Sequence, residues 1–289
     1  MTSKIMIALL PDRGVVSVAG ADASKLLQGI ITNDMALLDS QAAIHAGLLS
    51  PQGKLLFDFF VVRSADGFLL DVAREKAGDL AKRLTMYKLR AAVTIADASD
   101  NYVVAAVFGT GADHAGSTTF PDPRLGTLGS RALIAKALTP ISSASAEDYD
   151  THRISLGIPE GGKDFVYGDT FPHEALMDQL HGVSFAKGCY VGQEIVARME
   201  HRGTARKRVV PVVGEQPVTS SAEIKAGDVV IGTLGSVAGN RGLAMIRLDR
   251  AAEFKEKGVG LIAGDVPVRI EKPAWATYEF DSRMAGGPA

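Results

Sequence analysis

The chain of 289 residues is long enough for two domains, or for three if each of them is small. Its hydrophobic content of 46% and charged content of 22% are those of a globular protein, and they exclude a disordered tail or a collagen-like fibre. The 31 basic and 33 acidic residues leave a net charge of −2, so whole-chain charge does not attract nucleic acid. A single cysteine excludes an intramolecular disulfide and any metal centre that needs several thiolates from one chain.

Targeting and membrane signals are also absent from the sequence pattern. The N-terminal apolar run at 5–10 is too short for the core of a signal peptide. No apolar segment approaches the roughly 20 residues that a membrane-spanning helix needs. We therefore expect a soluble cytoplasmic protein without a membrane partner.

The first half of the chain predicts an α+β arrangement rather than a doubly wound sheet. A strand is expected at 14–18, followed by a short helix that Asp22 caps. Apolar runs at 55–62 and 68–72, joined by Ala-Asp-Gly, predict a hairpin. A helix over 74–90 and strands at 92–95 and 102–108 complete the pattern.

The second half begins with helices and ends with strands. Ser145 and Asp148 form a capping-box variant that predicts a helix ending at Gly157. Helices are also expected over 172–182 and 193–202, the last one terminated by a glycine. Short strands separated by turns that contain glycine and proline then predict an all-β module of about 80 residues, a sandwich or a barrel.

Cys189 is the candidate for thiol chemistry. Glycines nearby permit a tight backbone whose amides would face a thiolate or an anion, and Lys187 stands two residues before it. The backbone amides and the Lys187 ammonium would both favour the thiolate, which is the reactive form of the cysteine. The alternative is that the cysteine is a small buried hydrophobe, and the spacing leaves both open.

Asp58 is the second candidate, because it interrupts an apolar run on both faces of a predicted strand. Burying an ionised carboxylate at that position lowers the stability of the fold by several kcal/mol unless the carboxylate is paired. The partner is either internal, such as Arg90 or Arg153, or a ring N–H of a ligand in a pocket. A guanidinium at position 153 would pair with Asp58 or hold a ligand carboxylate.

One part of the chain is densely basic. A solvated helix end with a favourable dipole is its ordinary explanation, and binding of RNA or of an acidic protein is the alternative. The basic group consists of Arg198, His201, Arg202, Arg206, Lys207 and Arg208.

The six histidines lack the spacing of a metal-binding pair, so they are expected to be surface or core residues.

A long motif around the cysteine resembles the signature of the YgfZ-type folate-binding proteins. That family includes the mitochondrial factor that matures four-iron clusters, and it is related to the glycine-cleavage T-protein, an aminomethyltransferase. Shorter matches in the family's order are found at 27–29, 32–34 and 50–54, at Asp58, and at Arg153 with 157–159. The long motif is Lys187-Gly188-Cys189-Tyr190-x-Gly192-Gln193-Glu194, preceded by 182–185 and followed by Arg198 and 202–203.

The resemblance implies an α+β fold, a ring of three domains of the T-protein type. Two α+β domains would be interleaved in sequence, one of them ferredoxin-like, and an antiparallel β-barrel would close the chain. We expect the first domain at 1–44 and 140–205, the ferredoxin-like domain at 45–139, and the barrel at 206–289. The central channel of such a ring takes tetrahydrofolate.

The function implied is that of a tetrahydrofolate-binding accessory factor for the assembly or repair of 4Fe–4S clusters. Its partners would be iron–sulfur assembly proteins and client enzymes, including radical enzymes that modify tRNA. We expect a maturation factor with little or no catalytic activity, and a monomer. One alternative is an aminomethyltransferase that passes a one-carbon unit to tetrahydrofolate. The other is an RNA-binding accessory protein of tRNA modification, which would use Arg198, Arg202, Arg206, Lys207 and Arg208 for a weak RNA contact.

The resemblance also implies roles for single residues. Cys189 and Asp58 are the candidate catalytic residues, the cysteine for thiol chemistry or a transient iron contact. One cysteine cannot hold a four-iron cluster, so no metal site is expected within one chain, and other thiols must come from a dimer, glutathione or a partner protein. Ser155 replaces a glutamate that holds the pterin in the transferases. The residues expected to bind folate are Asp58, Arg153, Lys187, Gln193 and Glu194.

Overall fold

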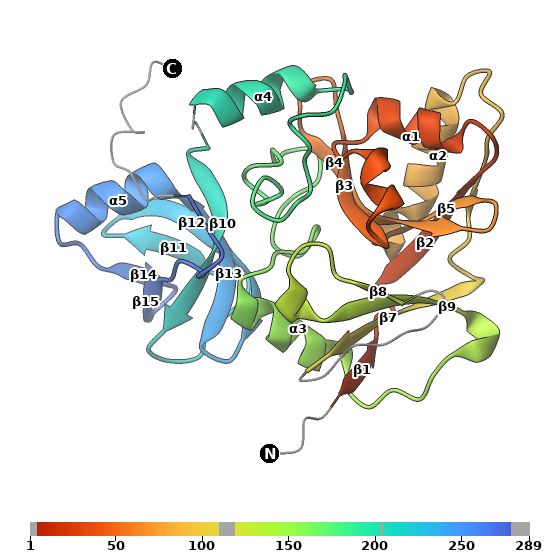
Figure 1. Cartoon of the computed structure of the whole chain (residues 1–289). Coiled ribbons are helices and arrows are strands. Elements are labelled where there is room, and N and C mark those ends of the chain that lie inside the picture. Colours follow the sequence, from red (N-terminus) through yellow and green to blue (C-terminus); the bar gives the residue numbers. More distant parts are fainter. Residues whose placement is uncertain (1–4, 110–118, 203–204, 279–289) are drawn as a thin grey trace. The chain divides into compact units, whose positions relative to one another are not determined.

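The computed structural model describes residues 5–109, 119–202 and 205–278, and the chain divides into two compact units (Figure 1). Unit 1 comprises 1–149 and 180–193, and unit 2 comprises 150–179 and 194–289. Among the described residues, no helix combines the length and the apolar character that crossing a membrane requires.

A five-stranded antiparallel sheet forms the larger part of unit 1. Two helices, α1 (Ala23–Ile30) and α2 (Ala77–Tyr87), share its core: Leu27 and Leu80 are fully buried with Phe59 of the sheet. The predicted hairpin is confirmed by the pairing of its two strands. Across the sheet the strands are β3 (Ala43–Leu49), β4 (Leu55–Ser64), β5 (Gly67–Ala73), β2 (Arg13–Ala19) and β6 (Thr94–Asp97).

A four-stranded antiparallel sheet completes unit 1, and buried charges join it to the first sheet. Asp71 of β5 accepts a hydrogen bond from Arg13 at 2.7 Å and one from Arg131 at 3.3 Å. The Arg131 guanidinium also lies 4.9 Å from the centre of the Phe60 ring. In spatial order the strands are β1 (Met6–Leu9), β7 (Tyr102–Phe108), β9 (Ser130–Ala135) and β8 (Thr119–Pro121).

The strand pairing crosses one of the expected domain boundaries. Strand β2 lies between β5 and β6, so residues before 44 belong to the same sheet as residues after 45. The pairing of an N-terminal strand with partners about 50 and 80 residues away is not visible in local sequence patterns. The ferredoxin-like character assigned to 45–139 stays a prediction.

Unit 2 contains the C-terminal β module, which is a closed barrel of six strands. A further helix, α5 (Leu248–Glu256), was not predicted, because its buried face carries mainly small residues such as Ala251 and Ala252. Around the barrel the order is β10 (Lys207–Gly214), β13 (Arg241–Arg247), β12 (Val229–Ala238), β11 (Glu223–Ala226), β14 (Leu261–Ala263) and β15 (Val266–Ile270).

Two predicted helices are confirmed together with their boundaries. Helix α3 (Ala146–Leu156) starts with the expected capping box, because the Ser145 hydroxyl accepts from the Asp148 N–H at 3.1 Å and the Asp148 carboxylate accepts from the Ser145 N–H at 2.8 Å. It ends at Gly157, whose φ is +77°. Helix α4 (Gln193–Arg202) has the predicted bounds. The glycine expected to terminate it lies outside the described residues.

The helix expected over 172–182 is wrong, since the chain forms successive turns there. Leu176 and His181 have φ of +62° and +55°, in the left-handed region that ends a right-handed helix. The capping role of Asp22 is also wrong. It occupies the N-cap position of α1, but its carboxylate accepts from the Ala92 N–H at 2.8 Å instead.

Candidate functional site

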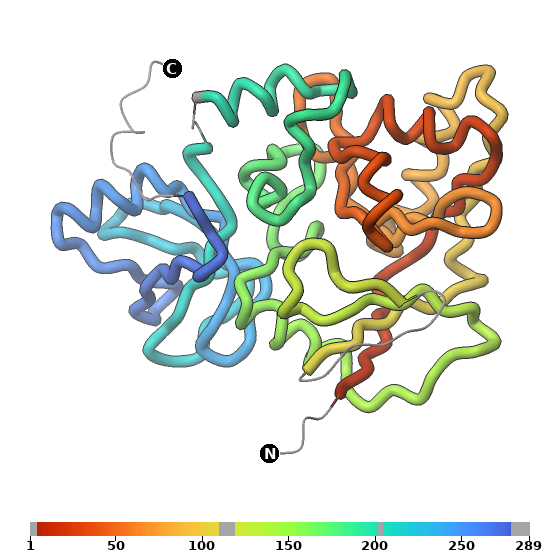
Figure 2. Tube along the Cα trace, in the orientation of Figure 1, coloured from red at the N-terminus to blue at the C-terminus, as the bar shows by residue number. Residues whose placement is uncertain are grey.

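The segment 180–193, which carries the cysteine, returns from unit 2 to unit 1 and lies against the turn that follows α1 (Figure 2). The buried Thr32 hydroxyl donates to the Gly182 carbonyl at 2.6 Å. The buried Asn33 amide donates to the His181 carbonyl at 2.7 Å. Two motifs about 150 residues apart in the sequence therefore form one structural piece.

Lys187 anchors this segment to the C-terminal end of α1. Its ammonium donates three hydrogen bonds of 2.8 Å, to the carbonyls of Gln28, Ile31 and Asn33. The last turn of a helix leaves its carbonyls free and carries a partial negative charge, which suits an ammonium. All three N–H donors of Lys187 are occupied in this way, which leaves none for the folate carboxylate expected from the sequence.

The other buried residues of the motif pack in a similar way. Tyr190 is buried with its ring 5.2 Å from the Lys187 ammonium, and burial raises the pKa of Tyr190 to about 12. The Gln193 side chain accepts from the Tyr190 N–H at 3.1 Å, which fixes the start of α4. Gly192 has a φ of +82° and lies against the turn at 50–53.

Two polar residues of the motif remain on the surface, Cys189 and Glu194. The interpretation of the cysteine as a small buried hydrophobe is therefore wrong. Phe185 is also 47% exposed, four residues before the thiol. The motif thus divides into residues that fix the backbone and residues that face solvent.

We expect Gly192→Ala to destabilise the protein far more than Gly188→Ala. A Cβ at position 192 would lie 2.6 Å from the Ser50 carbonyl oxygen, whereas none of the atoms around position 188 comes within 4 Å of an added Cβ. The clash and the positive φ together cost about 1–3 kcal/mol. Urea denaturation of both variants measures the difference, and equal midpoints would contradict the assigned packing.

We expect the stability of the protein to depend on the titration of Lys187. Burial lowers the pKa of Lys187 to about 8, although the Asp34 carboxylate raises it. The unfolded chain, with an ordinary lysine pKa of 10.5, binds more protons between pH 8 and 10.5, so stability rises with pH in that window. Since the ammonium is half-exposed, the rise is about 1 kcal/mol. Urea denaturation at pH 7.5 and pH 10.5 should show this rise in the wild type and not in Lys187→Met; identical pH dependence would refute it.

Asp58 lies on β4, opposite Gly47 of β3, and is 8% exposed. Its carboxylate lies 3.6 Å from Nε2 of His45, which is also buried. The internal partners expected from the sequence are wrong, because Arg90 is exposed and Arg153 binds other carboxylates within unit 2. His45 was expected to be an ordinary core or surface residue, and no local pattern relates it to the acid.

A cavity of about 650 Å³ opens within unit 1, and His45 forms part of its wall. A volume of this size accommodates a small ligand. Asp58 lies behind this wall, on the neighbouring strand. The other lining residues include Asn33, His181 and the prolines at 121 and 123.

Arg153 is fully buried in unit 2, and each of its three side-chain nitrogens donates at least one hydrogen bond. Its guanidinium donates to Asp150 at 2.6 Å, to Asp164 at 2.7 Å and to Ser236 of β12 at 2.6 Å. Burial alone lowers the pKa of Arg153, but the surrounding carboxylates hold it above its usual value. These contacts make Arg153 a link between α3 and the barrel, and its full burial leaves the guanidinium inaccessible to the predicted folate.

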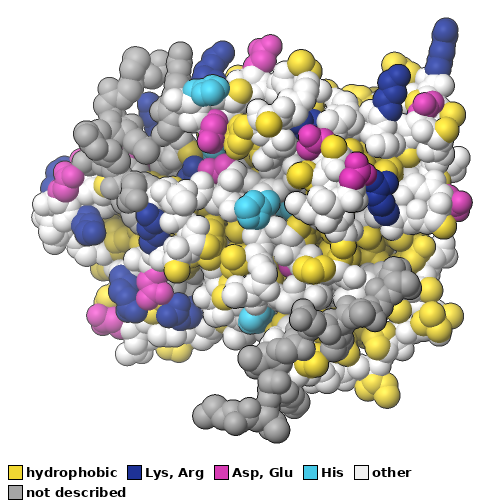
Figure 3. Space-filling model, in the orientation of Figure 1, with side chains coloured by type: hydrophobic (Ala, Val, Ile, Leu, Met, Phe, Trp, Pro, Cys, Tyr) yellow, Lys and Arg dark blue, Asp and Glu magenta, His cyan; other side chains and the backbone are white. Residues whose placement is uncertain are grey.

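Two of the described side chains in the basic group are taken up by ion pairs. Arg208 is buried and binds both oxygens of Asp178 at 2.8 Å, and Lys207 lies 3.7 Å from Glu174. Arg198 is exposed. Basic and acidic side chains are interspersed on the face drawn in Figure 3. The expected RNA surface therefore loses two of its members to ion pairs.

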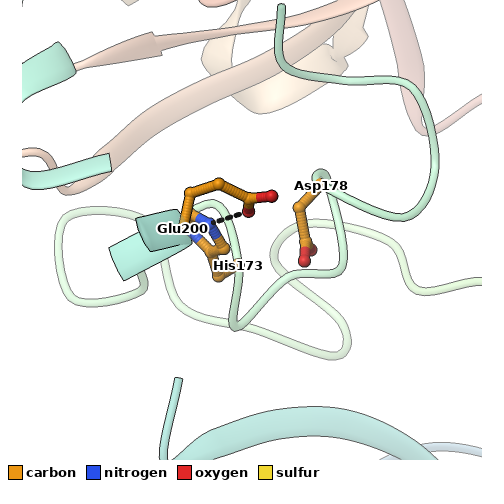
Figure 4. Close-up of side chains that lie close together, drawn as sticks. All are labelled: His173, Asp178 and Glu200. Carbon is orange, nitrogen blue, oxygen red and sulfur yellow. Dashed lines mark hydrogen bonds and ion pairs between the residues drawn. The ribbon is translucent and has the colours of Figure 1, made fainter. Parts of the chain in front are cut away.

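His173, Asp178 and Glu200 of unit 2 place their possible metal-ligand atoms within 4.8 Å of one another (Figure 4). His173 is buried, and its Nε2 lies 3.1 Å from the Glu200 carboxylate. Because Arg208 already holds both oxygens of Asp178, a cation would have to compete with a guanidinium there. We interpret the group as a hydrogen bond between His173 and Glu200 and an ion pair between Arg208 and Asp178, which tie the turns at 172–178 to α4 and β10.

Two comparisons with known proteins support the predicted fold. Residues 206–278 match the CAF17 C-terminal β-barrel domain. The glycine cleavage system aminomethyltransferase T from Bartonella henselae aligns with a TM-score of 0.73 at 16% identity, covering 95% of this chain and 87% of that one. The predicted fold, a T-protein-like α+β architecture with a C-terminal barrel, is confirmed.

The curated relatives decide the family. The mitochondrial iron–sulfur cluster assembly factor IBA57 of Mus musculus is 33% identical over 273 residues, which cover 82% of this chain and 76% of that protein. The chain belongs to the IBA57 family. The Mycosarcoma maydis member is 38% identical over 227 residues, 71% of this chain and 56% of that protein. The chain thus spans little more than half of some fungal IBA57 proteins.

The family membership corrects one prediction. The IBA57 proteins of Mycosarcoma maydis, Neurospora crassa, Mus musculus and Homo sapiens are all named as mitochondrial. The expected cytoplasmic location is therefore wrong. It followed from the lack of a recognisable apolar leader, and that lack does not distinguish between compartments without a secretory signal.

Proposed function

We propose that the chain acts in iron–sulfur cluster assembly and that Cys189 supplies one thiolate to a cluster shared with other thiol donors. The relatives carry the name of this process. The observation that carries the proposal is the exposed thiol on a segment fixed by Lys187 and Gly192. A four-iron cluster takes four ligands, so the others come from glutathione, a second copy or a partner protein.

The geometry around the thiol suits transfer between proteins. A ligand held on an anchored segment loses little conformational entropy when it binds, which raises its affinity for a shared cluster. Phe185 is 47% exposed in the same segment and offers an apolar contact to a partner. The clients would be enzymes that contain 4Fe–4S clusters, including radical enzymes that modify tRNA.

A strain that lacks the chain tests the assembly role. The activity of 4Fe–4S enzymes should fall while their protein levels stay unchanged, and the wild-type chain should restore the activity. Adding iron and sulfide to extracts should also restore part of the activity, because the apo-enzymes remain intact. Unchanged enzyme activity in the deletion strain would refute the role.

A reduced folate is the ligand that we propose for unit 1. Nε2 of the buried His45 makes no hydrogen bond to any described residue, and it faces the Asp58 carboxylate at 3.6 Å. A pterin ring carries both N–H donors and acceptors, so it would give the unpartnered Nε2 of His45 a hydrogen-bond partner at the cavity wall. Arg153 and Lys187 do not fit this role, because protein groups already occupy their donors.

We expect Asp58→Asn to weaken the binding of tetrahydrofolate at least about tenfold, since the charge 3.6 Å from Nε2 of the wall residue His45 is lost. Calorimetry on the wild type should give a dissociation constant in the micromolar range or weaker, about −8 kcal/mol or less in magnitude. Asp66→Asn, in the exposed turn between β4 and β5, is the control and should bind like the wild type. Equal affinities of all three proteins would exclude Asp58 from the site.

The two alternatives have less support. The sequence identity to the aminomethyltransferase is 16%, which supports a shared fold but not a shared activity. Turnover of an aminomethylated carrier protein with tetrahydrofolate would favour the transferase. The RNA-binding alternative loses Lys207 and Arg208 to ion pairs.

A further inference from the structure

The C-terminal end of α2 contains a residue in an unfavourable backbone conformation. Leu89 follows the helix with a φ of +46°, in the left-handed region. Helices commonly end with such a residue, but glycine is preferred there because it has no Cβ. The leucine side chain is 86% exposed. It therefore adds strain without contributing to the core.

A second large apolar side chain is exposed in the last turn of α2. Met86 stands three residues before Leu89 and is 69% exposed. The opposite face of α2 supplies the packing, because Leu80 and Leu84 are fully buried. The fold therefore does not need the apolar character of the exposed face.

The charge of this region is mainly positive, and its acidic neighbours include Asp79, which pairs with Lys82, and Asp22, which accepts from the Ala92 N–H at 2.8 Å. Residues 80–96 contain four basic and no acidic residues. Arg90 is exposed and forms no ion pair with any acidic residue that the structure describes. Lys82 is exposed and lies 3.5 Å from Asp79, and the Lys88 ammonium donates to a backbone carbonyl. An apolar tip next to the unpaired Arg90, in a region with an excess of basic residues, is complementary to an acidic surface with an apolar depression.

We propose that Met86, Leu89 and Arg90, the α2-end surface, form a docking site for an acidic protein partner. Leu89 would enter an apolar pocket of the partner, and Arg90 would pair with carboxylates beside it. A strained, exposed leucine is retained when its side chain makes contacts outside the chain. The site goes beyond the proposed function, because it involves neither the thiol nor the folate cavity.

The Leu89→Gly variant separates docking from folding, because it should raise the stability of the protein while it weakens docking to the partner. Glycine removes the strain at φ +46°, so the melting temperature should rise by about 2 °C. Maturation of 4Fe–4S enzymes in cells should fall about tenfold, the loss typical of an interface anchor. Ser221→Gly is the matched control, because Ser221 is exposed with a φ of +66° on the barrel. It should raise the melting temperature without affecting maturation.

If the Leu89→Gly variant supported the maturation of 4Fe–4S enzymes as well as the wild type does, the proposed docking site would be refuted. The maturation readout rests on the proposed function, and Cys189→Ser in the same assay tests that function separately. If Cys189→Ser also matures enzymes normally, the assembly role fails, and the surface is judged by cross-linking alone.

Cross-linking from the surface identifies the occupant. A photoreactive benzoylphenylalanine at position 89 should form an adduct in cells with an identifiable protein segment rich in aspartate and glutamate. The Arg90→Glu change should abolish the adduct, and the identified partner, once purified, should bind the wild type more weakly as salt increases. Adducts with lipid, with RNA or with a second copy of this chain, or no adduct, would each overturn the acidic protein partner.

Discussion

Replacement of Arg153 by methionine is expected to lower the free energy of unfolding by about 3–5 kcal/mol. The guanidinium is fully buried and binds Asp150, Asp164 and Ser236, while Glu160 lies 3.3 Å away. Without it, the fully buried Asp164 loses its guanidinium partner, whereas Lys163 still lies 3.2 Å from Asp150 and 3.3 Å from Glu160. The loss should be measured by urea denaturation followed by the fluorescence of the single tryptophan, which lies in unit 2.

Arg269→Met is the matched control within unit 2. Arg269 binds Glu271 at 2.9 Å, but its side chain is 65% exposed. Exposed ion pairs contribute about 0–1 kcal/mol, so this variant should remain close to the wild type. If the two variants lost the same stability, the burial of Arg153 would not be the reason for its retention. Folate binding by unit 1 should be unchanged in Arg269→Met.

Replacement of Cys189 by serine is expected to reduce the maturation of 4Fe–4S enzymes to the level of a deletion strain. Serine keeps the size and exposure of the side chain, so the fold should be unaffected. Its hydroxyl is a far poorer ligand for iron than a thiolate. The measurement is the activity of a 4Fe–4S enzyme in cells that carry each variant at equal protein level.

Gly188→Ala is the control for Cys189→Ser. Its added Cβ meets no atom within 4 Å, so the backbone of the segment should be preserved. We expect this variant to mature enzymes like the wild type. Full activity of the serine variant would show that the thiol takes no part in assembly, whatever its exposure.

Much of the fold could be predicted because local patterns determine it. The hairpin of β4 and β5 follows from two apolar runs and a turn sequence, and the start of α3 follows from Ser145 and Asp148. The segment 172–182 could not be predicted in this way. Its apolar spacing matches a helix, but Leu176 and His181 adopt left-handed conformations within a folded set of turns.

The candidate site was predicted as a set of residues but not as a geometry. A charged residue in a motif does not show its partner: Lys187 binds a carbonyl 159 residues away, and Arg153 binds Ser236 at a separation of 83. Both were therefore assigned to folate. Asp71, in an equally apolar strand, satisfies the argument that singled out Asp58, and it lies at the centre of a buried ion network.

The central claim is that the anchored, exposed thiol of Cys189 is a ligand of a shared cluster. Anaerobic reconstitution with iron, sulfide and glutathione tests it directly, with iron and sulfide counted per chain and the cluster followed by its visible circular dichroism. The account predicts that the wild type and Gly188→Ala hold a cluster and that Cys189→Ser holds none. Equal iron content and an identical spectrum in Cys189→Ser would contradict it.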